Sequence, residues 1–381
     1  MKTAACTHAC CDYVYRRAMN INAFGKTLRW SRKPISLFCL LLPAALFAAP
    51  GYNVFVTDEH SGDITVIDGA THKVTATFPV GKRPRGILVS ADHKTLFVAV
   101  SGTPISGPPQ LDAKGNPIFK KDDDDDDDKK ADKSADGIAL VDVQKKKLIR
   151  KIQVGSDPEQ LALSLDGTHL FVSNEDVGTA SSVNIATAKV EHIIPISKEP
   201  EGVGLRPDGK VFYVTCENDG EIYAIDAVAC KVIAHFNVGG RPRSVDFTPD
   251  SARGFIPSES AGQMHLIDSM QHKLLKTVDL PKGSRPMCVK VSPDGNKVYV
   301  STGRAGTICV LDAKTGDVTS TIKVGQRPWG IAISPDGKTL YAANGPSDDV
   351  SVVDLTSEKE VAKVPSKGSP WGIAIVPSTE R

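Results

Sequence analysis

Charged and aromatic side chains flank a proline that recurs seven times, at Pro84, Pro158, Pro200, Pro242, Pro286, Pro328 and Pro370. Carboxylates can act as general acids or bases, guanidinium groups bind anions, and tryptophan faces bind cations or apolar groups. The residues directly before and after these prolines include ten candidates for a binding surface: Arg83, Arg85, Glu159, Glu201, Arg241, Arg243, Arg285, Arg327, Trp329 and Trp371. They form a ligand or partner site if the fold brings them together. The alternative is that they pair with one another and only solvate the surface.

Glutamate also recurs in loops later in four of the repeats, at Glu59, Glu175, Glu217 and Glu259. Such residues could do acid–base or metal chemistry. However, only His60 supplies an imidazole there, and the chain has neither a glycine-rich phosphate loop nor a spaced Ser-His-Asp set. The sequence therefore predicts no catalytic residue, no metal site and no cofactor, although active sites assembled from separate repeats leave little trace in a linear sequence.

The spacing of the prolines predicts the fold. Successive gaps are 74, 42, 42, 44, 42 and 42 residues, and the first is one ordinary unit plus about 32 inserted residues. A period near 42 is typical of a β-propeller, in which each unit is one four-stranded blade. We therefore predict an all-β, seven-bladed propeller with antiparallel strands over residues 50–378, with almost no helix.

Each unit begins with a nearly continuous apolar strand, such as Gly330-Ile331-Ala332-Ile333, which should line the central channel. The last strand of a unit, such as 318–324, alternates and should be outermost. The segment 52–57 resembles a second strand, whereas the chain stops after 372–376, a first strand. We expect the amino-terminal strands to complete the last blade, which removes the open sheet edges.

The sequence of the amino terminus is typical of an export signal, which lies within an extension over residues 1–49. Basic residues at Lys26, Arg29, Arg32 and Lys33 precede an apolar run over residues 35–47, which is too short to span a bilayer, and two alanines follow. We expect a periplasmic or otherwise exported protein without a membrane span once the signal is removed, and a monomer. The formal net charge of +1 argues against a nucleic-acid partner.

An insert over residues 102–136 lies between the second and third strands of the first complete blade. It contains seven consecutive aspartates, Asp122 to Asp128, flanked by lysine pairs. Like charges in such a run repel, so we expect a disordered solvated loop rather than an ordered cation site.

Four cysteines lie after the predicted signal: Cys216, Cys230, Cys288 and Cys309. In the expected strand register neither Cys216 and Cys230 nor Cys288 and Cys309 lie close enough to bridge. We predict no intrachain disulfide and interpret these cysteines as small buried residues.

The repeats resemble the YVTN family of β-propeller repeats, in segments such as Phe171-Val172-Ser173-Asn174 and Tyr341-Ala342-Ala343-Asn344. Within it, segments 80–87, 199–202, 241–243, 344–354 and 370–372 resemble the periplasmic propellers associated with pyrroloquinoline quinone (PQQ)-dependent alcohol catabolism. The resemblance implies an exported, non-catalytic binding or accessory protein, whose partner would be a periplasmic quinoprotein dehydrogenase or a cytochrome. Two other functions stay open. One is an enzyme such as a lactonase-like hydrolase, or a carrier of a porphyrin-type cofactor. The other is a structural or adhesive cell-surface propeller.

Overall fold

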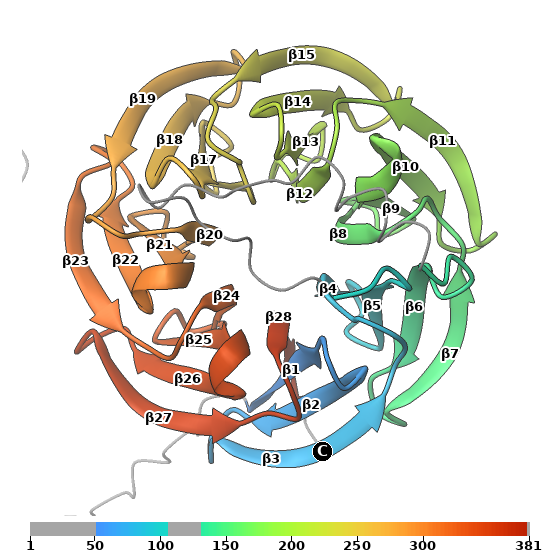
Figure 1. The fold of residues 1–381 in the computed structure, drawn as a ribbon, viewed down its shortest axis with the longest axis horizontal. Helices are drawn as coiled ribbons and strands as arrows, with labels where there is room; N and C mark the ends of the chain where they lie inside the picture. Colours follow the sequence, from blue (N-terminus) through green and yellow to red (C-terminus); the bar gives the residue numbers. More distant parts are fainter. Residues whose placement is uncertain (1–50, 106–130, 379–381) are drawn as a thin grey trace, which may run out of the picture. The chain divides into compact units, whose positions relative to one another are not determined.

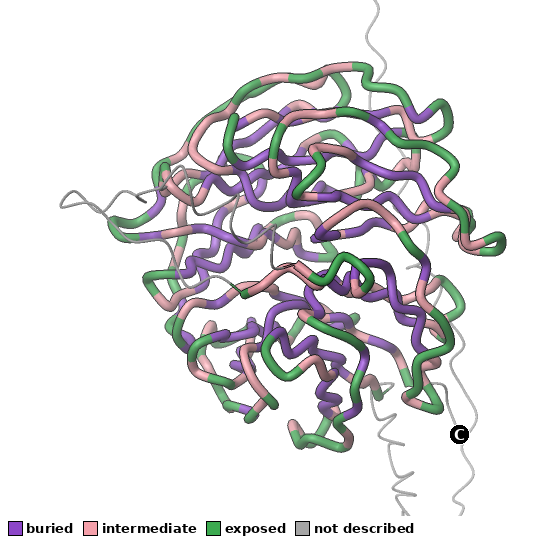
Figure 2. The backbone as a smooth tube through the Cα atoms, turned by 45° about the vertical axis from the view of Figure 1, so that its right-hand side comes forward, coloured by how far each residue is buried: buried purple, intermediate pink, exposed green. Residues whose placement is uncertain are grey.

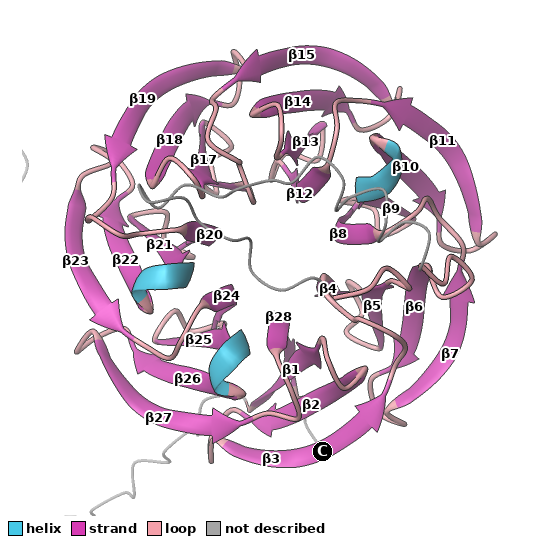
Figure 3. Cartoon of the chain, in the orientation of Figure 1, coloured by secondary structure: helices cyan, strands magenta, loops and turns pink. Residues whose placement is uncertain are grey.

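The computed structural model describes residues 51–105 and 131–378, which form seven four-stranded antiparallel sheets arranged in a ring (Figure 1). The predicted extension and signal, residues 1–49, and the aspartate run lie outside the described residues. The helices of the described part are three single 3-10 turns (Figure 3), η1 (Glu175–Val177), η2 (Gly303–Ala305) and η3 (Gly345–Ser347). The seven-bladed, almost helix-free architecture predicted from the period is confirmed.

Blades 1 to 3 follow one another along the chain. Their strands are β4 (Ile87–Val89), β5 (Thr95–Val100), β6 (Gly137–Asp142) and β7 (Lys147–Ile152) in blade 1, β8 (Pro158–Leu163), β9 (His169–Asn174), β10 (Thr179–Asn184) and β11 (Lys189–Pro195) in blade 2, and β12 (Pro200–Leu205), β13 (Val211–Cys216), β14 (Glu221–Asp226) and β15 (Lys231–Asn237) in blade 3.

Blades 4 to 6 repeat the pattern, and blade 7 mixes both ends of the chain. The strands are β16 (Asp246–Phe247), β17 (Arg253–Ser258), β18 (Gln263–Asp268) and β19 (Lys273–Asp279) in blade 4, β20 (Pro286–Val291), β21 (Lys297–Thr302), β22 (Thr307–Asp312) and β23 (Val318–Lys323) in blade 5, β24 (Pro328–Ile333), β25 (Thr339–Asn344), β26 (Asp349–Asp354) and β27 (Lys359–Pro365) in blade 6, and β28 (Pro370–Pro377), β1 (Tyr52–Asp58), β2 (Asp63–Asp68) and β3 (Lys73–Pro79) in blade 7.

The last blade closes the ring, as predicted. Its sheet order is β28-β1-β2-β3, and β1 pairs with β28 in antiparallel register, with Val54 opposite Ile375. The first strand of each blade lies nearest the central channel and the fourth lies outermost (Figure 1).

Turn residues account for the regular length of the blades. The aspartate that ends a third strand, such as Asp68 or Asp226, accepts hydrogen bonds from the backbone N–H groups two and three residues later. Aspartate commonly forms turns in this way, by accepting from backbone N–H groups just after it in the chain.

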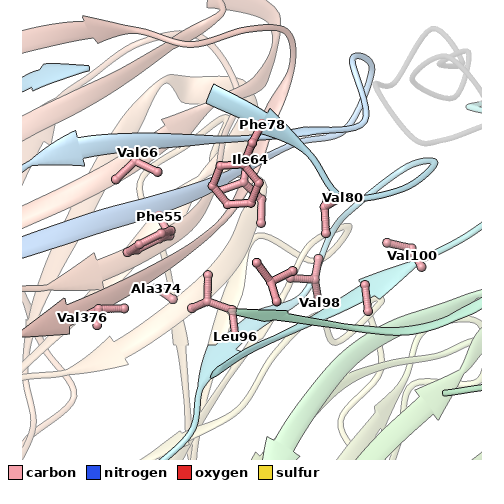
Figure 4. Packing of buried hydrophobic residues seen from close by; sticks show 12 residues of the cluster. Phe55, Ile64, Val66, Phe78, Val80, Leu96, Val98, Val100, Ala374 and Val376 are labelled. Carbon is pink, nitrogen blue, oxygen red and sulfur yellow. The ribbon is translucent and has the colours of Figure 1, made fainter. Parts of the chain in front are cut away.

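Apolar side chains pack between neighbouring blades rather than in one central core. Buried residues follow the inner three strands of each blade, whereas the outer strands are largely exposed (Figure 2). Between blades 7 and 1, for example, Phe55, Ile64 and Phe78 pack against Leu96 and Val98 (Figure 4). Each blade is therefore stabilised mainly by its two neighbours, as in other repeat architectures.

The cysteines of the described chain are free, as predicted. Cys216, Cys230 and Cys309 are buried, and Cys288 is half-buried. No helix among the described residues has the length and apolar character needed to cross a bilayer.

A buried imidazole in blade 4 makes stability depend on pH. His265 is 2% exposed, hydrogen-bonds Ser258 and Thr277, and has a pKa lowered to about 4 by burial. The unfolded chain, with a pKa near 6.5, therefore binds more protons than the folded chain between about pH 6.5 and pH 4. We expect this group to lower the free energy of unfolding by about 2 kcal/mol between pH 7.5 and pH 5.

Urea unfolding at both pH values measures this loss. The variant His265→Gln, which keeps polar atoms but does not titrate, should show a pH dependence smaller by that amount. An equal pH dependence in both proteins would show that His265 does not titrate on unfolding as described.

Candidate functional site

The loops at one mouth of the channel surround a hollow of about 490 Å³, which we call the rim hollow. Nine of the ten candidates from the sequence line it: Arg83, Arg85, Glu159, Glu201, Arg241, Arg243, Arg327, Trp329 and Trp371. The tenth, Arg285, lies in an adjoining hollow of blades 4 to 6. The structure thus brings nearly the whole predicted set together, and its binding role stays a prediction.

The residue before six of the seven repeat prolines has an unusual backbone. Arg83, Asp157, Glu199, Arg241 and Arg327 have φ between +43° and +58°, and Ser369 has φ +51°. This left-handed region disfavours residues with a Cβ by about 1 kcal/mol or more, so glycine would fit there more easily. Five of these six left-handed positions are occupied by charged residues rather than by glycine.

Arginines of blade 1 meet carboxylates of blades 7 and 2. Arg83 Nε lies 3.0 Å from Glu59 Oε1 and its Nη1 lies 3.2 Å from Asp157 Oδ2. Arg85, only 5% exposed, bonds Asp157 at 2.5 Å and also pairs with Glu159. Burial opposes ionisation of Asp157, but the guanidinium charges of Arg85 and Arg83 hold its pKa below the usual value.

A second set of ion pairs joins blades 3 and 4. Arg243 pairs with Glu217 and lies 3.2 Å from Glu201. Arg241 also pairs with Glu217, and Glu259 lies 3.8 Å from its Nε. The charges therefore pair across neighbouring blades, which is the alternative that the sequence left open. These ion pairs surround the rim hollow.

An aromatic wall faces these charges where blades 6 and 7 meet. The rings of Trp329 and Trp371 stack at 5.9 Å between centroids, and the Arg327 guanidinium lies 4.7 Å from the centre of the Trp329 ring. Glu259 and Glu59 act on Arg327 electrostatically, but among the described residues no carboxylate lies within 4.0 Å of its guanidinium. Its charge is therefore available to an anionic group that enters the rim hollow.

Glu175 is the carboxyl group best suited to proton transfer. It lines the rim hollow with 22% of its side chain exposed, and its Oε2 lies 3.8 Å from Arg85 Nη2. Burial and the neighbouring negative charge of Asp157 raise the pKa of Glu175 well above 4.5. Two carboxyl groups held this close cannot both ionise readily, and the group with the raised pKa can exchange protons nearer neutral pH.

The same place offers the one three-carboxylate cluster found in the described chain. Ligand atoms of Asp157, Glu159 and Glu175 lie within 4.8 Å of one another, and Glu159 Oε2 is buried without a hydrogen-bond partner. These oxygens could contribute to a cation site. However, Arg83 and Arg85 lie within ion-pair distance of all three carboxylates, so much of the negative charge that would attract a metal ion is compensated.

The sequence placed Arg285 at the rim because it treated all seven repeats alike. In blade 5 the positive φ falls on Gly283 instead of on the residue before the proline. The Arg285 guanidinium consequently turns to the backbone oxygens of Glu259 and Ser260. Asp348 and His60 also line the rim hollow but are absent from the predicted set. Asp157 is absent from that set too, although it pairs with two lining residues, Arg83 and Arg85. Asp157 directly precedes the repeat proline Pro158, and this position in the repeat was the sequence feature that could have identified it.

We expect removal of Arg85 to destabilise the ring strongly, because Asp157 and Glu159 would remain buried without their main counter-charge. The variant Arg85→Met should lose roughly 3–5 kcal/mol of unfolding free energy in urea. Lys94→Met, at a side chain that is 77% exposed, is the matched control and should change little. Adding Glu159→Gln to Arg85→Met should restore part of the loss; an unchanged loss in that double variant would contradict the assigned pairing.

Comparison with known proteins adds a family match over part of the chain. The model of a family described as "Lactonase, 7-bladed beta-propeller" matches residues 200–364. The uncharacterized protein YncE of Salmonella typhimurium is 39% identical over 57 residues, which are 15% of this chain and 16% of that protein. The match thus spans less than a fifth of that relative's length.

Solved structures share the fold over most of the chain. The periplasmic gluconolactonase PpgL of Pseudomonas aeruginosa is 20% identical, with a TM-score of 0.66, over 86% of this chain and 99% of that one. A putative 6-phosphogluconolactonase from Bacteroides uniformis is 15% identical, with a TM-score of 0.68, over 86% and 100%. Hydrazine synthase of Kuenenia stuttgartiensis is 19% identical, with a TM-score of 0.66, over 79% and 92%. At these identities the likeness shows the fold alone.

The expected role as a non-catalytic accessory of PQQ-dependent alcohol oxidation is wrong. The family match over residues 200–364 is to lactonases. This match supports the enzyme alternative instead. The sequence argument failed because a propeller repeat specifies the scaffold, whereas the activity depends on loops. What the comparisons establish is that the chain is similar to lactonase-type seven-bladed propellers.

Proposed function

We propose that the protein is a hydrolase that opens cyclic esters, with its active site in the rim hollow. The observation that carries this proposal is the placement of Glu175, whose carboxyl has a raised pKa, in a hollow shared with a stacked tryptophan pair and with Arg327. The lactonase family match over residues 200–364 supports the same reaction class.

The residues suit ester hydrolysis with one carboxylate as both base and acid. Ionised Glu175 would take a proton from water as its oxygen adds to the lactone carbonyl carbon. When the ring C–O bond breaks, the protonated Glu175 would return that proton to the leaving ring oxygen, giving a hydroxy acid. A carboxylate with a raised pKa is a stronger base than an ordinary glutamate and can serve in both steps.

Arg327 suits the role of stabilising the negative charge that develops on the carbonyl oxygen. Burial lowers its pKa, but the guanidinium stays protonated at neutral pH. It is fixed over the Trp329 ring, so its charge is oriented before substrate arrives. Charge stabilisation of this kind commonly accounts for a large share of the rate. Trp329 and Trp371 would hold the substrate ring by contact with its apolar face.

A panel of lactones tests the proposal. The purified protein, incubated with gluconolactone, δ-valerolactone and γ-butyrolactone in a pH-stat, should release acid from at least one of them above the spontaneous rate. The variant Arg327→Met should lower kcat by roughly 10²-fold, whereas the surface control Lys94→Met should not. No turnover of any lactone, or full activity in Arg327→Met, would overturn the proposal as stated.

Export remains part of the proposal and rests on the basic flank and apolar run over residues 26–49. Fractionation of cells that express the full chain should place it outside the cytoplasm, shortened at its amino terminus. Full-length protein in the cytoplasmic fraction would contradict export without bearing on the hydrolase.

A further inference from the structure

A second cavity, of about 300 Å³, lies along the inner strands of all seven blades, and we call it the hub cavity. It shares Glu201, Arg243, Trp329 and Trp371 with the rim hollow, so the two spaces adjoin. Its size falls at the lower end of the range for small-molecule sites. The inner strands that line it surround the channel axis in Figure 1.

The repeat itself shows which polar residues in the hub cavity are unusual. At the fourth position after the repeat proline, five blades have Leu88, Ala162, Gly204, Ala332 and Ala374. Blades 4 and 5 instead have Asp246 and Lys290, which both line the hub cavity. Because the same strand position is apolar in five other blades, the fold does not require a charge there.

The two charges differ in how they are satisfied. Asp246 Oδ2 accepts a hydrogen bond from the Val291 backbone N–H at 2.8 Å, across the boundary between blades 4 and 5. Lys290 Nζ, by contrast, has no hydrogen-bond acceptor in the described part of the chain, and its interaction with Asp246 is electrostatic rather than a close ion pair. Lys290 is half-buried, so its three N–H donors lie in a confined space with no protein partner.

We propose that the hub cavity binds the carboxylate group of a small organic anion, with Lys290 Nζ as its anchor. One ammonium group beside Asp246 suits a singly charged ligand. A phosphate dianion would require a second available cation, and Arg243 is held by Glu201 and Glu217. Lys290 and Asp246 do not line the rim hollow, although the hub cavity shares Trp329 and Trp371 with it, and the proposed binding does not depend on the hydrolase chemistry.

Cys288 provides a built-in reporter for this site. It lies two residues before Lys290 on β20, on the same side of the strand, and its half-buried side chain also lines the hub cavity. Residues two apart on a strand are separated by about 7 Å. An alkylating reagent whose carboxylate contacts Lys290 would therefore be held near the Cys288 thiol.

The experiment compares alkylation of Cys288 by iodoacetate with alkylation by the neutral iodoacetamide, followed by mass spectrometry of the Cys288 peptide. The ratio of the two rates cancels any change in the pKa of the thiol. The variant Lys290→Met should lower this ratio roughly three- to tenfold, and Asp246→Asn should raise it, because the competing negative charge is gone. Thermal unfolding of each variant confirms that the ring is intact, and the two opposite shifts cannot both arise from partial unfolding.

Protection by added ligands identifies the class of anion. Butyrate should slow alkylation of Cys288 in the native protein, and butanol at the same concentration should not. Inorganic phosphate that protects better than butyrate would contradict a carboxylate site. An unchanged reagent ratio in Lys290→Met would overturn the proposal, whatever the result of the lactone assays.

Discussion

The variant Glu175→Gln is expected to lose roughly 10²- to 10⁴-fold in kcat for lactone opening while the ring stays folded. Glutamine keeps the size of the side chain but can neither accept the proton of the attacking water nor return one to the leaving oxygen. Because the substitution also removes a negative charge next to Asp157, the thermal midpoint should stay the same or rise. Loss of activity with gain of stability is the combination that a catalytic rather than a structural residue produces.

A matched control for this variant is Glu191→Gln. Glu191 lies on the outer strand β11, 2.9 Å from His169 and away from the channel. The variant Glu191→Gln should keep full activity. Activity retained in Glu175→Gln would remove that residue from the mechanism even if lactones are substrates.

Deletion of residues 52–80 is expected to abolish cooperative unfolding of the whole ring. The deletion removes β1, β2 and β3, leaves β28 as a single strand, and exposes the apolar surfaces of blades 1 and 6 that packed on blade 7. It also leaves the backbone hydrogen-bonding groups of β28 without their partners on β1. Because stability in such an array depends on contacts between neighbours, the loss should not stay confined to blade 7.

Circular dichroism during heating measures this result, with the full chain as reference. A peptide of residues 51–80, added to the deleted protein, should restore part of the transition if closure is the cause. A deleted protein that is monomeric and melts like the full chain would show that the ring does not depend on its mixed blade.

The sequence predicted the ring and its closure because both depend on repeating local features. The proline spacing recurs with each blade, and residues 52–57 match the second strand of the other repeats, so the whole chain supports one interpretation. For the mouth of the channel, the sequence predicted which side chains gather there. Arg285 is the exception, because the left-handed residue of its loop is Gly283, two positions earlier, and the Arg285 side chain turns to the Ser260 backbone oxygen.

The chemistry of the site could not be predicted in the same way. Arg85 and Asp157 lie 72 residues apart in the chain, and their pairing depends on how blades 1 and 2 face each other. The raised pKa of Glu175 is a product of burial and of that neighbour, neither of which has a local sequence pattern. Asp246 and Lys290 could have been singled out by aligning the seven first strands, since they interrupt an apolar position.

The most direct test of the hydrolase is the pH dependence of kcat/KM for whichever lactone is turned over fastest. A general base must be ionised to act, so the rate should rise with pH through the pKa of Glu175 and then level off. Since that pKa is raised, the rising limb should lie well above pH 4.5 in the native protein and be absent from the residual activity of Glu175→Gln. The same rising limb in both proteins would contradict the account, because the proton would then be exchanged by another group.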